Sequence, residues 1–183
     1  MQDWHSHSNF SDGDDSIAEL VENAFRYKIT EFAVSDHYHM IKDFEQYHEE
    51  LSRYPISKSV EIYAPHIIQG KVDVEWCNKK LDFVIIEELH RVPTDRTIEK
   101  INIPIIVAHP DPSIIPKIAG MNIYYEINLS QGIPDKKVLQ QLIDNKIKVT
   151  VGSDIHSLIE FNMNLLNYAN NIANTINNSI NRD

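Results

Sequence analysis

Near the N-terminus, residues 5–13 read HSHSNFSDG, and the expected fold can be worked out from them. This stretch follows a short β-type run at residues 3–5, so His5 and His7 come at the end of a predicted strand. In an extended chain, residues two positions apart point to the same face, and both imidazoles can therefore reach one ion. Asp12 follows in the next loop and adds a carboxylate. The stretch predicts a metal site at the end of the first strand.

The rest of the chain alternates short apolar runs with amphipathic helical stripes. Ser16 and Glu19 predict a capping box for the first helix, and a long helix is expected at 158–180. The near-continuous apolar character of the runs predicts parallel strands that are buried on both faces. This order predicts an α/β fold, either a β/α barrel or a doubly wound sheet, in one domain over residues 1–183. The expected strands are residues 3–5, 31–35, 66–72, 82–86, 104–108, 123–128 and 148–152.

Histidines and aspartates gather where the predicted strands end. The carboxyl ends of the strands in a β/α barrel converge on one face, where active sites lie. Imidazoles and carboxylates suit zinc, manganese or iron, and this set is too large for one tetrahedral ion. We therefore expect two or three divalent ions. Six of the nine histidines follow strand ends, together with Asp12, Asp36 and Asp154: His5, His7, His37, His90, His109 and His156.

The three other histidines are not assigned to the site. His48 lies within a predicted helix, His66 begins a predicted strand far from the expected site, and His39 is left as a neighbour of His37.

Composition narrows the classes of partner. The net charge of -10 argues against a nucleic-acid partner, because phosphate backbones attract basic surfaces. No run of about 18 apolar residues predicts a membrane span, and the N-terminus lacks the features of a signal peptide. The single cysteine, Cys77, has no partner for an internal disulfide and indicates a reducing compartment, so we expect a cytoplasmic protein.

Five motifs together resemble the PHP family, named for polymerase and histidinol phosphatase. Residues 5–13 resemble its H-x-H-S-x-x-S-D-G motif, and residues 35–37 (SDH) resemble its T-D-H. His90 falls where the family has a histidine after the fourth strand. Residues 108–110 (AHP) and 152–156 (GSDIH) resemble A-H-P and G-S-D-x-H. The resemblance implies a distorted TIM-like barrel of seven β/α units with a centre of two or three metal ions.

The resemblance also implies how the side chains are shared among the ions. One ion would be held by His5, His7 and Asp154. Asp36 is expected to orient a ligand or accept a hydrogen bond. The other two ions would take Asp12, His37 and His156 for the second, and His90 and His109 for the third.

One family residue has no counterpart where it is expected. The family carries G-x-E near the end of its third strand, and that glutamate bridges two metals. Here residues 69–75 read QGKVDVE, which places Val72 or Lys71 at the bridging position. The sequence leaves five candidates for the missing charge: a carboxylated Lys71, Asp73, Glu75, Glu87 and Glu88.

The expected reaction is hydrolysis of a phosphate ester by metal-bound hydroxide. The substrate is expected to be a small phosphorylated metabolite, with histidinol phosphate as one candidate and a nucleotide or oligonucleotide end as another. The sequence contains neither a P-loop nor a G-x-S-x-G elbow that would supply a nucleophilic side chain. Asp12 or His109 could protonate the leaving group. Arg91, next to His90, is the candidate to bind phosphate, and a surface salt bridge is an equally good explanation for it.

Two other functions fit the same residues. A metal-dependent amidohydrolase could also carry H-x-H on a first strand and a late aspartate. A non-catalytic metal-binding module is the second alternative, and the missing bridging glutamate is the observation that favours it. The substrate, the identity of the metal and the oligomeric state stay open.

Overall fold

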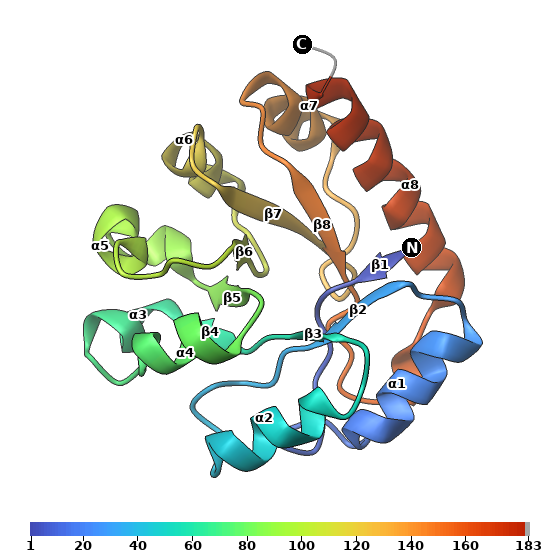
Figure 1. Ribbon diagram of the computed structural model, residues 1–183. Coiled ribbons are helices and arrows are strands. Elements are labelled where there is room, and N and C mark those ends of the chain that lie inside the picture. Colours follow the sequence, from blue (N-terminus) through green and yellow to red (C-terminus); the bar gives the residue numbers. More distant parts are fainter. Residues whose placement is uncertain (182–183) are drawn as a thin grey trace.

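The computed structural model describes residues 1–181, and strands alternate with helices along that length. Figure 1 shows the strands spread about a common centre with the helices outside them. The strands are β1 (Gln2–Asp3), β2 (Glu31–Val34), β3 (Ser57–Lys58), β4 (Glu61–Tyr63), β5 (Val84–Glu87), β6 (Ile105–Val107), β7 (Ile123–Asn128) and β8 (Val149–Gly152). The helices are α1 (Ile17–Arg26), α2 (Phe44–Ser52), α3 (Ala64–Ile68), α4 (Val74–Lys80), α5 (Thr94–Ile98), α6 (Ile115–Ile118), α7 (Lys136–Asp144) and α8 (Met163–Ile180), with short 3-10 turns η1 (Leu89–Arg91), η2 (Pro112–Ile114) and η3 (Leu158–Glu160).

The strands form two parallel sheets, in the orders β1-β2-β3 and β4-β5-β6-β7-β8. Only two residues separate β3 from β4, so these strands occupy one position between β2 and β5. Isolated parallel bridges cross the two gaps between the sheets, one joining His37 to Glu61 and the other joining Ser6 to Ile155. The strands thus follow a ring of seven positions. Within residues 1–181 no continuous ladder closes it, and the fold is the distorted TIM-like β/α barrel that the family resemblance implies.

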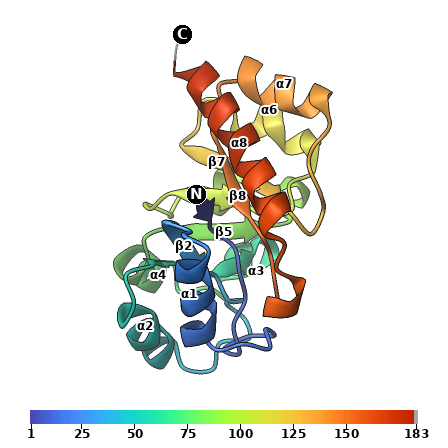
Figure 2. The same cartoon turned by 90° about the vertical axis from the view of Figure 1, so that its right-hand side faces the viewer.

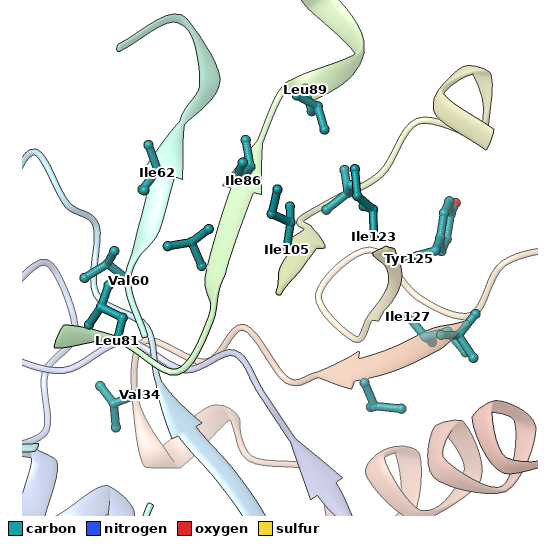
Figure 3. Close-up of a cluster of buried hydrophobic side chains, with 14 of the residues drawn as sticks. Val34, Val60, Ile62, Leu81, Ile86, Leu89, Ile105, Ile123, Tyr125 and Ile127 are labelled. Atoms are coloured by element: carbon teal, nitrogen blue, oxygen red, sulfur yellow. The ribbon is translucent and has the colours of Figure 1, made fainter. Parts of the chain in front are cut away.

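Apolar side chains pack in two separate layers. Figure 3 shows part of the larger layer, with Val34, Ile86 and Ile127 among the labelled side chains. It also includes Leu20 on α1 and Leu166 on α8, so it joins the strands to the surrounding helices. Alternate strand residues face the other way and form a small inner cluster. Its buried members are Ala33, Phe83, Ile85, Ile106 and Ala108. This alternation explains why the strands look apolar throughout.

Helix α8 lies beside the first and the last strand. Figure 2 shows α8 and α1 on the same side of the molecule. The Asn170 side chain accepts a hydrogen bond from the Gln2 amide (2.8 Å) and donates one to its carbonyl (2.9 Å). Asn177 makes the same pair of bonds with Val149, each at 2.9 Å. These amides hold β1 and β8 beside each other and so position the residues that follow both strands.

The predicted strand at 66–72 is wrong. Residues Ala64–Ile68 form α3 instead, with Pro65 in its first turn, and Gly70 follows with φ 68°. Proline early in a helix and glycine after its end are helix signals, and they outweigh the β-branched residues between them. The strand lies earlier, at 57–63, as β3 and β4. The expected last helix is also divided, because η3 precedes α8.

The expected capping box is confirmed. The Ser16 side chain accepts from the Glu19 amide, and the Glu19 carboxylate accepts from the Ser16 amide (2.8 Å). Within residues 1–181, no helix combines the length and the apolar character that crossing a membrane requires.

Candidate metal centre

The carboxyl ends of the strands bring histidine and carboxylate side chains together. Four groups of three or four side chains each place their ligand atoms within 4.8 Å of one another. Seven of the eight side chains that the sequence assigns to metals belong to these groups, and two glutamates join them. The groups are His7, Asp12, His37 and His156; His5, His7 and Glu61; His5, His109 and Asp154; and His37, Glu61 and Glu87. Because His5, His7, His37 and Glu61 are each shared by two groups, they form one continuous centre.

A buried carboxylate that the sequence analysis did not single out, that of Glu61, lies among the histidines. It is 0% exposed, and its Oε2 lies 2.9 Å from His37 Nδ1. Its oxygens also lie 3.5 Å from His5 Nε2 and 3.6 Å from His7 Nε2. Burial acts to raise the pKa of Glu61, but the surrounding imidazoles hold that pKa well below its usual range. Apolar Val60 and Ile62 flank it in an alternating run, which is the sequence pattern that could have revealed a strand here.

The other candidates for the missing charge lie away from the centre, with the exception of Glu87. Lys71 and Asp73 lie in the loop between α3 and α4, and Glu75 lies in α4, so none of these three follows the end of a strand. Asp73 caps α4 by accepting from the Trp76 amide (2.9 Å), and Glu75 pairs with Lys79 (2.7 Å). Lys71 is exposed.

His90 and Arg91 are not brought into the ligand groups of residues 1–181. Strand β5 ends at Glu87, whose side chain faces the centre, and the backbone then turns at Glu88 with φ 54°. This turn carries His90 into η1, where its carbonyl accepts from Lys117 Nζ (2.9 Å). Arg91 pairs with Glu88 at 2.8 Å. Glu87 therefore occupies the place at which the sequence analysis expects a fourth-strand histidine.

His39, which the sequence does not assign to the site, lies beside the centre. Its ring is 5.5 Å from the His37 ring and 5.6 Å from the His66 ring, measured between centroids. His66 does not begin a strand as predicted: it lies in α3, which follows directly after β4, the strand that carries Glu61.

Buried hydrogen bonds orient the ligand side chains from outside the groups. Glu126 Oε1 is 2.8 Å from His5 Nδ1, which leaves His5 Nε2 to face His7. Glu126 Oε2 accepts from the His109 amide (3.2 Å) and from the Asn128 side chain (2.9 Å). A carboxylate behind a histidine fixes the ring and its tautomer, an arrangement common at metal sites.

Asp36 holds the loop that carries Asp12. It accepts hydrogen bonds from the Ser8 amide (2.7 Å), the Ser8 hydroxyl (2.7 Å) and the Ser11 hydroxyl (2.6 Å). Burial raises the pKa of Asp36, and these donors act against that rise. Asp36 thus accepts hydrogen bonds and belongs to none of the ligand groups within residues 1–181.

The atoms at the centre fit divalent metal ions. His7 Nδ1, both oxygens of Glu61 and His109 Nε2 are buried and have no hydrogen-bond partner. Such atoms are costly to bury unless something else satisfies them. They converge with other imidazole and carboxylate atoms, the donor set that suits zinc, manganese and iron. His109 and Asp154 also adopt positive φ angles, 43° and 56°, a backbone strain typical of functional sites.

The most exposed side of the centre adjoins a cavity. Asp12 is 38% exposed and His156 is 37% exposed, whereas Asp154 is 8% exposed. A cavity of about 440 Å³ begins at Asp154 and His156 and is also lined by Ser130, Glu160 and Asn162.

Comparison with known proteins identifies a family and related folds. The sequence model of the PHP domain matches residues 3–177. A chain from the cryo-EM structure of archaeal ribonuclease P with mature tRNA superimposes with a TM-score of 0.61 over 99% of this chain and 90% of that chain. The two sequences are 13% identical, so this likeness concerns the fold. No curated protein sequence matches the chain.

Proposed function

The chain belongs to the PHP domain family, and from this we propose that it is a metal-dependent phosphoesterase that acts on a small phosphorylated molecule. The observation that carries the proposal is the convergence of nine histidine and carboxylate side chains at one end of the barrel. The unpartnered atoms of Glu61 and His109 within this cluster are its strongest support.

Two or three divalent ions fit the shared groups. His5, His7, His109, Asp154 and Glu61 would hold ions at the buried side. At the exposed side, the ligands would be His37, Asp12, His156 and Glu87. A bound divalent ion supplies positive charge that offsets the phosphate oxygens, and it acidifies nearby water toward a pKa of about 7.

The chain's own side chains would orient the substrate and move protons. The ester would approach from the side of Asp12 and His156, because these are the exposed members of the cluster. Asp12 is then placed to give a proton to the leaving oxygen. His109 is the second candidate whenever its Nε2 does not hold an ion: that nitrogen lies 3.0 Å from Asp154 Oδ2, and the Asp154 carboxylate raises the pKa of His109 in spite of burial.

The cavity beside His156 would hold the rest of the substrate. Its lining includes the hydroxyl of Ser130 and the amide of Asn162. No lysine or arginine lines it among the residues that the structure describes, which favours a leaving group without a second anionic charge. The net charge of -10 acts in the same direction against nucleic acid. A cytoplasmic location also belongs to this proposal, and the free buried thiol of Cys77 supports it.

The position of Glu61 favours an active centre over a non-catalytic module. The argument for it was the absent bridging carboxylate, and Glu61 now provides a buried carboxylate between two ligand groups. Because Glu61 belongs to two ligand groups, a centre with more than one metal ion explains the site better than a single ion does.

The test combines metal analysis with hydrolysis of 4-nitrophenyl phosphate, in the presence and absence of added manganese or zinc. We expect two or three ions per chain and release of phosphate that depends on them. Asp12→Asn and His109→Gln should each reduce the rate at least about 100-fold, the range usual for a lost general acid.

His48→Gln is the matched control, because His48 lies on α2 next to Trp76, outside the ligand groups. A protein that binds its full set of ions and hydrolyses neither this ester nor the diester bis(4-nitrophenyl) phosphate would contradict the proposal.

A further inference from the structure

A second cavity lies at the opposite end of the barrel from the metal centre. Its volume is about 460 Å³, within the range of small-molecule sites. Gln2, Glu31 and Ser57 line it, and each is the first residue of its strand. The metal ligands follow the carboxyl ends of these strands, so the barrel interior separates the two sites.

Aromatic and apolar side chains form the walls of this cavity. The Trp4 and Phe83 rings meet edge to face, with centroids 5.3 Å apart and planes at 88°. Tyr124 and Ile106 add further wall surface. Phe83 and Ile106 are buried in the inner cluster, whereas Trp4 and Tyr124 pack against that cluster and stay partly exposed. Flat partly exposed rings around a cavity of this size suit a flat aromatic occupant.

Thr150 provides an independent sign of a ligand. It is 7% exposed and lines the cavity, and its hydroxyl oxygen is buried without a hydrogen-bond partner. A side chain at Gly152, two residues further along β8, would meet Glu126 and His5 inside the barrel. Thr150 therefore points to the interior as well. A polar atom in this position remains unsatisfied unless an occupant bonds to it.

The charged side chains that line the cavity are acidic. Glu31 and Asp82 contribute carboxylates, and no lysine, arginine or histidine lines the cavity in the described part of the chain. Aromatic faces also attract cations. An anionic occupant would meet repulsion here, and a cationic one would meet attraction.

We propose that this cavity binds a flat aromatic molecule that carries a positive charge, with its ring between Trp4 and Tyr124 and a polar atom bonded to the Thr150 hydroxyl. The site is separate from the metal centre, and the proposal does not depend on phosphoesterase activity.

Nuclear magnetic resonance of the ¹⁵N-labelled full chain provides the test. The protein contains two tryptophans, and their indole N–H signals can be followed separately. Trp4 lines the cavity. Trp76 lies on α4, where its indole N–H donates to Glu45 (3.0 Å), and serves as the internal control. The probes are tryptamine and indole-3-propionate, which share a ring system and differ in the sign of their charge.

We expect tryptamine to shift the Trp4 signal in a saturable way and to leave the Trp76 signal in place. Indole-3-propionate should bind at least about tenfold more weakly because of the two carboxylates. Thr150→Val keeps the shape of the side chain and removes the hydroxyl, so it should weaken tryptamine binding about fivefold. Thr175→Val, at an exposed position on α8, is the matched control. Glu31→Gln removes one of the two carboxylates at an exposed position, so it should reduce the difference in affinity between tryptamine and indole-3-propionate.

Three results would overturn the proposal. The first is no saturable and selective shift of Trp4 with tryptamine up to about 10 mM. The second is equal affinity for the two probes in the wild-type chain. The third is an unchanged affinity in Thr150→Val when its spectrum shows a folded protein.

Discussion

Replacing Glu61 by glutamine tests the architecture of the metal centre most directly. The change keeps the size of the side chain and removes its charge. Glu61 belongs to two ligand groups, one with His5 and His7 and the other with His37 and Glu87. Its loss should therefore weaken binding of two ions, while a side chain that serves one group should affect one.

The expected loss of metal-induced stabilisation follows from the number of ions affected, which is two. Losing a residue that merely supports a ligand costs about 10–100-fold in metal affinity, and losing a direct ligand costs at least as much. This equals about 1.4–2.7 kcal/mol for each ion, and about 3–5 kcal/mol for two. At a fixed excess of metal, the stabilisation that metal provides falls by the same amount. For a chain of this length, a loss of about 3–5 kcal/mol lowers the metal-induced rise of Tm by about 6–20 °C.

The assay is thermal unfolding with and without manganese or zinc, together with metal content by mass spectrometry. Glu87→Gln is the matched comparison, because Glu87 is a carboxylate that belongs to one ligand group, the one with His37 and Glu61. It should lose about half as much of the metal-induced stabilisation. If Glu61→Gln lowers the Tm equally with and without metal, the carboxylate is structural and the reasoning fails.

Three further predictions concern single positions. Glu87→Gln should lower the metal content by one ion while His90→Gln leaves it unchanged; the reverse pattern in mass spectrometry would return the fourth-strand ligand to His90. Cys77 is 1% exposed and burial raises its pKa to about 12, so a disulfide reagent at pH 8 should label one thiol per chain only after unfolding in guanidinium, and rapid native labelling would contradict the packing of α4. Gly152→Ala would push a methyl group against Glu126 and should cost about 1–3 kcal/mol in thermal unfolding, whereas an unchanged Tm would show that the space is larger than the structure indicates.

Much of the fold could be predicted because its signals are local. Helix α1 has its capping box in four consecutive residues, and β7 has the predicted bounds of 123–128. The segment at 57–72 failed because two local signals compete there. Its β-branched residues favour a strand, but the peptide between Pro65 and Gly70 has the ends of a helix. The strand before it is short and half polar, since it alternates between the outer packing layer and the metal centre.

The family motifs, the alternation of strands and helices, and seven of the side chains that meet at the centre can be read from the amino-acid sequence. They depend on spacing along the chain, and a parallel α/β fold brings the residues that follow its strands to one face. The positions of Glu61 among the histidines and of Glu87 in place of His90 emerge only in the folded chain. The same is true of Glu126 behind His5. Those positions depend on which side of a strand faces the interior and on where a turn bends the backbone, and residues distant in sequence determine both.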